Sequence, residues 1–141
     1  MKAIIFLFTT FFLFNYSNSK SQTIEDISTS TAVYEIKDGA IFNLSTGKSV
    51  YKLVNNVIKN SQSGKSLYTV VDGVLKSSAT KKSLYKYENG NVSSFGSDAP
   101  IYVINDSGVI KSWSMGTGFY RINGNFGAGE LYLVLLATGL L

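Results

Sequence analysis

The stretch "SLYTVVDGVLKSS" (66–78) places a short apolar run on each side of an Asp-Gly pair. Side chains of a β-strand alternate between its two faces, so Tyr68 and Val70 lie on the same face. Asp-Gly tolerates the positive φ angles of a type I′ turn, which joins two antiparallel strands. The stretch therefore predicts a β-hairpin.

Similar stretches lie on both sides of it, "SVYKLVNNVIKNS" (49–61) before and "SLYKYENGNVSSF" (83–95) after. An apolar residue precedes each tyrosine of the series, and an apolar or aromatic residue follows two positions later. The register survives one extra residue in the turn "NDSG" (105–108), which indicates internal duplication. The tyrosines recur every 17 residues, and once after 18, at Tyr34, Tyr51, Tyr68, Tyr85, Tyr102 and Tyr120.

Residues 33–126 are therefore predicted to form six β-hairpins in an all-β fold. One hairpin cannot bury its apolar face alone, so neighbouring hairpins must cover one another. We favour a stack or solenoid of hairpins. A meander sheet closed into a barrel is the alternative, because closure removes exposed sheet edges. A propeller is disfavoured, since six hairpins make fewer four-stranded blades than propellers use.

The N-terminal residues 1–21 have the pattern of a secretory signal peptide. Lys2 precedes the apolar run "AIIFLFTTFFLF" (3–14), and small polar residues follow it. Cleavage is expected between Ser21 and Gln22, and residues 22–32 are expected to form a linker. The apolar run is shorter than the about 20 residues that span a bilayer, so the mature chain is expected to have no membrane span. The sequence predicts a secreted bacterial protein, in the periplasm or at the cell surface.

The C-terminal residues 127–141 are predicted to form an apolar closing strand. Their segment "LYLVLLATGLL" (131–141) begins like a seventh hairpin but lacks the turn. Leu133 takes the place of a polar residue in the earlier hairpins, and Leu135 lies on the same face. A strand that is apolar on both faces is either buried within the protein, which we favour, or covered by a partner or a second copy of the chain.

The residue inventory argues against catalysis. The chain has no His and no Cys, which removes the commonest general base, the commonest zinc ligands and the thiol nucleophile. Acidic residues at the turns, such as Asp72, are expected to hydrogen-bond their own backbone. "SGKS" (63–66) lacks the first glycine of a phosphate-binding loop. The sequence predicts no catalytic residue, no metal site, no cofactor and no enzyme activity.

The charge pattern gives little reason to expect a nucleic acid partner. The mature chain Gln22–Leu141 holds 11 basic and nine acidic residues without a block of basic residues. Lys59, Lys76 and Lys111 share one strand position and are expected to form a row. We favour a solvated row that keeps the protein soluble, over one that contacts an anionic polymer such as a cell-wall glycan.

Two aromatic residues, Phe95 and Trp113, occupy equivalent ends of predicted second strands. Burial against the next loop is favoured for both. If exposed, either ring would be able to stack on a sugar.

The unit "KSLYTVVDGVLKSSATKKSLYKYENGNVSSF" (65–95) resembles the hairpin repeats of choline-binding and glucan-binding surface modules. In that family an aromatic-rich strand, an Asp-Gly or Asn-Gly turn and a second strand recur along the chain, and the resemblance covers the architecture of residues 33–126. The family binds through paired Trp and Tyr residues. This chain has one Trp, so those binding residues are not carried over.

Together, these patterns predict a non-enzymatic binding module of the bacterial envelope, which contacts a glycan or an envelope protein through repeated hairpin faces. The alternative is a structural subunit that docks into an assembly through its C-terminal strand. The predicted contact residues are Lys59, Lys76, Lys111, Phe95, Trp113, Leu133 and Leu135.

Overall fold

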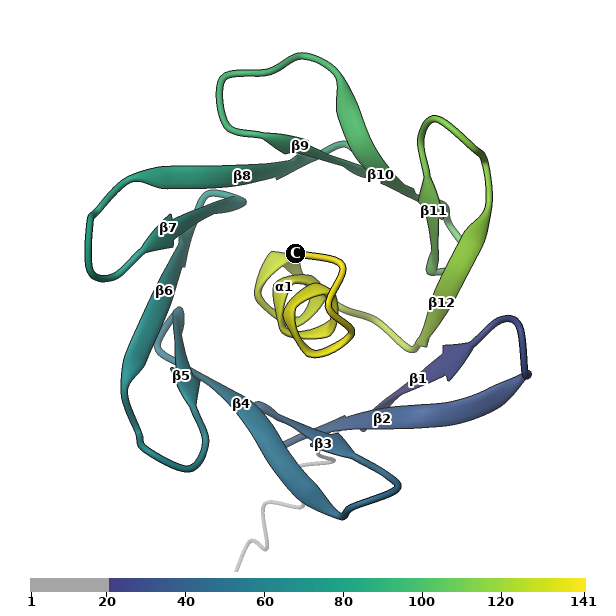
Figure 1. The fold of residues 1–141 in the computed structure, drawn as a ribbon, viewed down its shortest axis with the longest axis horizontal. Coiled ribbons are helices and arrows are strands. Elements are labelled where there is room, and N and C mark those ends of the chain that lie inside the picture. The colour runs from purple at the N-terminus through teal and green to yellow at the C-terminus, as the bar shows by residue number, and fades with distance from the viewer. Residues whose placement is uncertain (1–20) are drawn as a thin grey trace, which may run out of the picture.

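The computed structural model describes residues 21–141, so the predicted signal peptide lies outside the described residues except for Ser21. Within this part of the chain, twelve antiparallel strands close into a barrel around one helix (Figure 1). The strands are β1 (Gln22–Asp26), β2 (Thr31–Lys37), β3 (Ala40–Asn43), β4 (Lys48–Val54), β5 (Val57–Asn60), β6 (Ser66–Val71), β7 (Val74–Ser77), β8 (Ser83–Glu88), β9 (Asn91–Ser94), β10 (Pro100–Ile104), β11 (Val109–Ser112) and β12 (Gly118–Asn123), and the helix is α1 (Ala128–Ala137).

The order of the strands around the barrel follows the order of the chain, and β1 pairs with β12 to complete the ring. The all-β class and the hairpin architecture are confirmed. The favoured stack or solenoid is wrong, and the closed meander is the observed arrangement. Closure gives each of the twelve strands described in residues 21–141 a hydrogen-bonded neighbour on both sides, as is expected of a barrel without sheet edges.

The tight turns have the geometry expected from their sequences. At Asp38-Gly39 and at Asp72-Gly73 both central residues have positive φ, with Gly39 and Gly73 each at 75°. The carbonyl of Gly39 also accepts a hydrogen bond from the backbone N–H of Leu53, at 2.7 Å. A Cβ at Gly39 would lie 2.9 Å from the carbonyl oxygen of Leu53, so this turn has no room for a side chain.

The predicted linker 22–32 instead contains β1, the strand that closes the barrel, and the turn that leads into β2. β1 pairs with both β2 and β12, and Ile24 lies opposite Ile122 with no exposed surface. Asp26 accepts hydrogen bonds at one oxygen from the hydroxyl and the backbone N–H of Ser28. The Ser28 hydroxyl bond holds the pKa of Asp26 below its usual value. β12 has no following strand of its own, so the N-terminal segment supplies its missing neighbour.

The predicted C-terminal strand is also wrong, because residues 128–137 form α1, which lies inside the barrel (Figure 1). A strand in that place would need hydrogen-bonding neighbours on both edges, whereas a helix satisfies its backbone groups internally. Glu130 supports the helix start by accepting a hydrogen bond from the backbone N–H of Gly127, at 2.9 Å. No helix in residues 21–141 is long and apolar enough to cross a bilayer.

Packing and hydrogen bonds fix α1 within the barrel. Five consecutive residues, 131–135, have no exposed surface and join the inward-facing residues of the strands in one core. The Tyr132 hydroxyl donates to the carbonyl of Gly73 at 2.7 Å. Tyr34 donates to the carbonyl of Ala137, the last residue of α1, at 2.9 Å. These bonds tie the middle and the C-terminal end of the helix to the surrounding barrel.

Tyr132→Phe is expected to change the response of stability to high pH. Burial raises the pKa of Tyr132 above its usual value of 10. Below pH 10 both the folded and the unfolded chain keep the phenol proton. Above it only the unfolded chain releases that proton, so the free energy of unfolding falls by about 1.4 kcal/mol per pH unit. The Phe variant lacks this contribution.

Urea denaturation between pH 8 and pH 11.5 measures the difference. At pH 8 the Phe variant is expected to be about 1 kcal/mol less stable, because it loses one hydrogen bond. This deficit is expected to shrink steadily above pH 10. A deficit that stays constant with pH would contradict the buried position of the Tyr132 hydroxyl.

Candidate functional site

The interior of the barrel is packed, so the surfaces open to a large ligand lie on its outside. α1 fills the centre of the ring, and residues 131–135 are completely buried there. Leu133 and Leu135 therefore belong to the core of the folded chain and not to a surface that a partner reaches. A cavity of about 260 Å³ lies beside the C-terminal part of the helix, between Tyr68, Tyr85, Leu136 and Leu141, and its lining is mainly apolar and aromatic.

Phe95 and Trp113 are exposed, contrary to the burial that the sequence analysis favoured. Their exposed fractions are 53% and 58%. Phe95 directly follows β9, where Val92 is buried, and strand alternation therefore turns Phe95 to the outer face. Its backbone N–H donates to the carbonyl of Leu84 at 2.8 Å, which holds the backbone while the ring stays in solvent.

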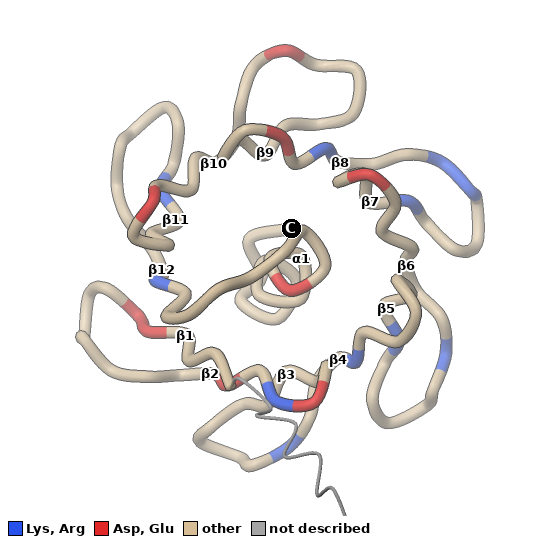
Figure 2. Tube along the Cα trace, turned by 180° about the vertical axis from the view of Figure 1, so that it is seen from behind, with Lys and Arg blue, Asp and Glu red and all other residues tan. Residues whose placement is uncertain are grey.

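The three lysines of the predicted row do not lie together. Lys59 on β5 lies opposite Lys52, and Lys76 on β7 lies opposite Thr69. Lys111 on β11 lies opposite Val103. Figure 2 shows β5 and β7 on one side of the ring and β11 on the other. The barrel therefore separates Lys111 from the other two, which a straight stack of hairpins would have aligned.

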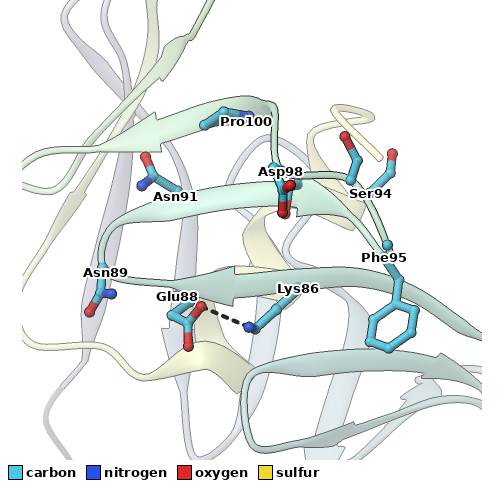
Figure 3. A pocket seen from close by; sticks show the side chains of 11 residues that line it. Lys86, Glu88, Asn89, Asn91, Ser94, Phe95, Asp98 and Pro100 are labelled. Atoms are coloured by element: carbon cyan, nitrogen blue, oxygen red, sulfur yellow. Dashed lines mark ion pairs between the residues drawn. The ribbon is translucent and has the colours of Figure 1, made fainter.

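The outer face of β8 and β9 carries the candidate site, which we name the Phe95 groove. It is a half-open cavity of about 410 Å³. Figure 3 shows Phe95 at one end, Asn89 at the other, and Lys86 and Glu88 between them along β8. The side chains that line the groove and can contact a ligand come from β8 and the turn after it, from β9, and from the loop between β9 and β10. They are Lys86, Glu88, Asn89, Asn91, Ser93, Phe95 and Asp98.

The groove combines an aromatic ring with many hydrogen-bonding groups. The Lys86 ammonium forms an ion pair with Glu88, with 2.7 Å between Nζ and Oε2. Within residues 21–141, no hydrogen bond engages the side chains of Asn89, Asn91 or Asp98. Amide and carboxylate groups of this kind donate to and accept from hydroxyl groups. The arrangement suits a ligand that has one face for stacking and many hydroxyl groups at its edges.

A second outer groove of about the same volume lies between Lys37, Asp38, Phe42 and Lys52. Phe42 is half-buried there. The hydroxyls of Ser49 and Ser61, which also line it, hydrogen-bond each other at 2.5 Å. This groove therefore offers less exposed aromatic surface and fewer unengaged polar groups than the Phe95 groove.

The described residues provide little for catalysis. Among residues 21–141 no three His, Cys, Asp or Glu side chains gather to hold a metal ion. The Phe95 groove has two carboxylates, and Glu88 is held by Lys86 while Asp98 lies in an exposed loop.

Sequence reasoning found Phe95 but missed the residues around it. Lys86, Asn91 and Asp98 join Phe95 only because β8, β9 and the following loop fold onto one outer surface. A signal was present, since Lys86 and Ser93 lie on the same side of the predicted hairpin as Phe95. Comparisons with models of known protein families, with curated proteins and with solved structures find no match for this chain.

Proposed function

We propose that this chain is a secreted, non-enzymatic repeat protein of the bacterial envelope that binds a glycan through the outer faces of its hairpins. The single observation that carries the proposal is the exposed ring of Phe95 in a groove lined by unengaged polar side chains. The internal duplication and the secretion rest on the tyrosine spacing and on residues 1–21.

The composition of the groove supports a glycan over other small ligands. Small-molecule sites usually enclose most of an apolar ligand and fix it with few polar groups. The Phe95 groove is open and mainly polar, with its one aromatic ring at the end. A sugar chain matches this pattern, because each ring has an apolar face for stacking and hydroxyl groups around its edge.

The alternative is a structural subunit that docks into a larger assembly through its C-terminal segment. It has less support, because Leu133 and Leu135 lie on α1 and have no exposed surface. A partner would have to contact Leu136, Leu140 and Leu141, which are partly exposed.

Phe95→Ala is expected to weaken glycan binding by about tenfold or more, because an exposed aromatic anchor at a binding site contributes about 1–3 kcal/mol. Isothermal titration with the glycans that score highest in an array measures the loss. Leu44→Ala is the matched control, since Leu44 is 43% exposed at the equivalent position after β3. The control is expected to bind like the unchanged protein.

Two results would contradict the proposal. Equal affinities of the Phe95→Ala and Leu44→Ala variants for the glycan would mean that the Phe95 groove is not the binding site. Cleavage of the bound glycan during prolonged incubation would contradict the non-enzymatic function, and Glu88→Gln and Asp98→Asn would then identify the carboxylate responsible.

A further inference from the structure

The charges of the barrel are segregated between two parts of the ring. Residues 44–87 hold eight lysines and a single acidic residue, Asp72. The remaining residues from 22 to 141 hold three basic and eight acidic residues. Because residues 44–87 supply β4 to β7 and all of β8 except its last residue, Glu88, the lysines collect on one arc of the ring (Figure 2). We name this surface the lysine arc; it comprises Lys48, Lys52, Lys59, Lys65, Lys76, Lys81, Lys82 and Lys86.

The lysines of the arc are on the outside of the barrel. On β5, Ile58 is completely buried, so its neighbour Lys59 faces outward. Lys52 lies directly opposite Lys59 on β4, and Lys76 and Lys86 lie on the outer faces of β7 and β8. Lys48 is the first residue of β4, and Lys65, Lys81 and Lys82 lie in the loops that project from the ring; all four are exposed.

The arc carries an unfavourable arrangement of charge that the fold itself does not need. Lys52 and Lys59 are cross-strand partners, and like charges directly opposite each other destabilise a sheet. Among residues 21–141, one ion pair within the arc offsets its charge, that of Lys86 with Glu88. The facing Lys52 and Lys59 therefore favour a surface on which an anionic ligand neutralises the charge.

The lysine arc is continuous with the Phe95 groove. Lys86 lines the groove and is the last lysine of the arc. On β7, Val74 lies opposite Lys86, and Lys76 is two residues further along the same face. A chain molecule that leaves the groove past Lys86 therefore meets Lys76 on the next strand.

We propose that the ligand of the Phe95 groove is an acidic polysaccharide, whose carboxylate groups contact the lysine arc across several hairpins. This proposal rests on the proposed function and gives the chemical class of its ligand. A polymer is needed, because β4 to β8 extend over a larger surface than one sugar covers. Many weak lysine contacts along one polymer add up to a measurable affinity, since each contact after the first is intramolecular.

The test uses polygalacturonate as the probe, with its fully methyl-esterified form as the uncharged counterpart on the same backbone. Biolayer interferometry with the immobilised chain is expected to give at least tenfold tighter binding of the acidic form. This preference is expected to fall as salt is raised from 50 to 500 mM, because salt screens exposed charges. Equal binding of the two forms would overturn the proposal.

A triple variant, Lys52→Gln with Lys59→Gln and Lys76→Gln, is expected to lose about tenfold in affinity for polygalacturonate while its binding of the methyl ester is unchanged. The matched control is Lys37→Gln with Lys111→Gln and Arg121→Gln, which removes three basic residues outside the arc. This control is expected to bind like the unchanged protein. An equal loss in both variants would mean that net charge alone decides binding and would contradict the arc.

The same experiment separates this inference from the proposed function. Phe95→Ala could weaken the binding of polygalacturonate and of its methyl ester, while the triple variant changes neither affinity. The groove would then bind glycan, and the lysine arc would have no part in binding. If the triple variant alone weakens binding, the arc holds the polymer and the groove proposal fails. Polyaspartate serves as a charged polymer without sugar rings, and equally tight binding of polyaspartate would overturn the assignment to a polysaccharide.

Discussion

Deleting residues 22–26 is expected to abolish the cooperative unfolding transition of this protein. These residues form β1, which is hydrogen-bonded to β2 on one side and β12 on the other. The deletion removes Ile24 from the core and leaves two unpaired edges, which promote aggregation. We expect a largely insoluble product, and loss of the sharp urea transition in whatever remains soluble.

Ile24→Ala makes the same test without removing backbone pairing. Its free energy of unfolding is expected to fall by about 2–5 kcal/mol, the range for truncating a large buried aliphatic residue. Thr29→Ala, in the exposed loop between β1 and β2, is the control and is expected to change stability by less than about 0.5 kcal/mol. A deletion variant that unfolds at the same urea concentration as the full chain would mean that β1 does not close the barrel.

Leu133→Asp is expected to unfold the protein or to expel α1 from the barrel. Leu133 has no exposed surface, and an unpaired carboxylate buried there costs several kcal/mol. That cost is a large part of the about 5–15 kcal/mol that stabilises a typical domain. Urea denaturation followed by circular dichroism measures the loss. Leu133→Met, the control, nearly keeps the volume of the side chain. It is expected to lower the free energy of unfolding by less than about 1.5 kcal/mol.

This substitution also distinguishes the core position of Leu133 from a position in an interface. A Leu133→Asp variant that stays folded and monomeric, but no longer joins an assembly that the unchanged chain forms, would contradict the buried helix. It would restore the docking role that the sequence suggested for the C-terminal segment.

The hairpins were predictable from sequence because each carries two independent local signals. Tyr68 and Val70 mark the inward face of one strand, and Asp72-Gly73 supplies the turn. How the hairpins close was harder to predict, because the same local pattern suits a stack and a ring. The difference lies in β1, and its signal was present: Ile24 precedes Ile41, and Asp26 precedes Asn43, by the same 17 residues that separate the tyrosines.

The helix was missed for a different reason. Residues 131–136 are apolar without interruption, so they show neither the period of a strand nor that of an amphipathic helix. Whether such a segment forms a strand or a helix depends on which neighbours it has, and inside a closed barrel only the helix satisfies its own backbone. Glu130 near the start of α1 was the one local indication of a helix.

The candidate site was predicted only in part, because the exposure of a side chain depends on how neighbouring hairpins are arranged around the ring. The shared position of Phe95 and Trp113 identified both residues as candidates, but it did not predict that they are exposed. The lysine row was predicted as a straight line through Lys59, Lys76 and Lys111. The ring places Lys111 elsewhere and puts Lys52 beside Lys59 instead.

The ligand is expected to bind on the outside of the barrel, because α1 fills the inside. An NMR titration of the ¹⁵N-labelled chain with trigalacturonate locates the bound ligand. We expect shifts of the backbone amide signals of Lys86, Asn91 and Phe95, with no change at Leu136 and Leu141. Shifts confined to Leu136, Leu141 and the tyrosines beside them would contradict binding on the outside of the barrel.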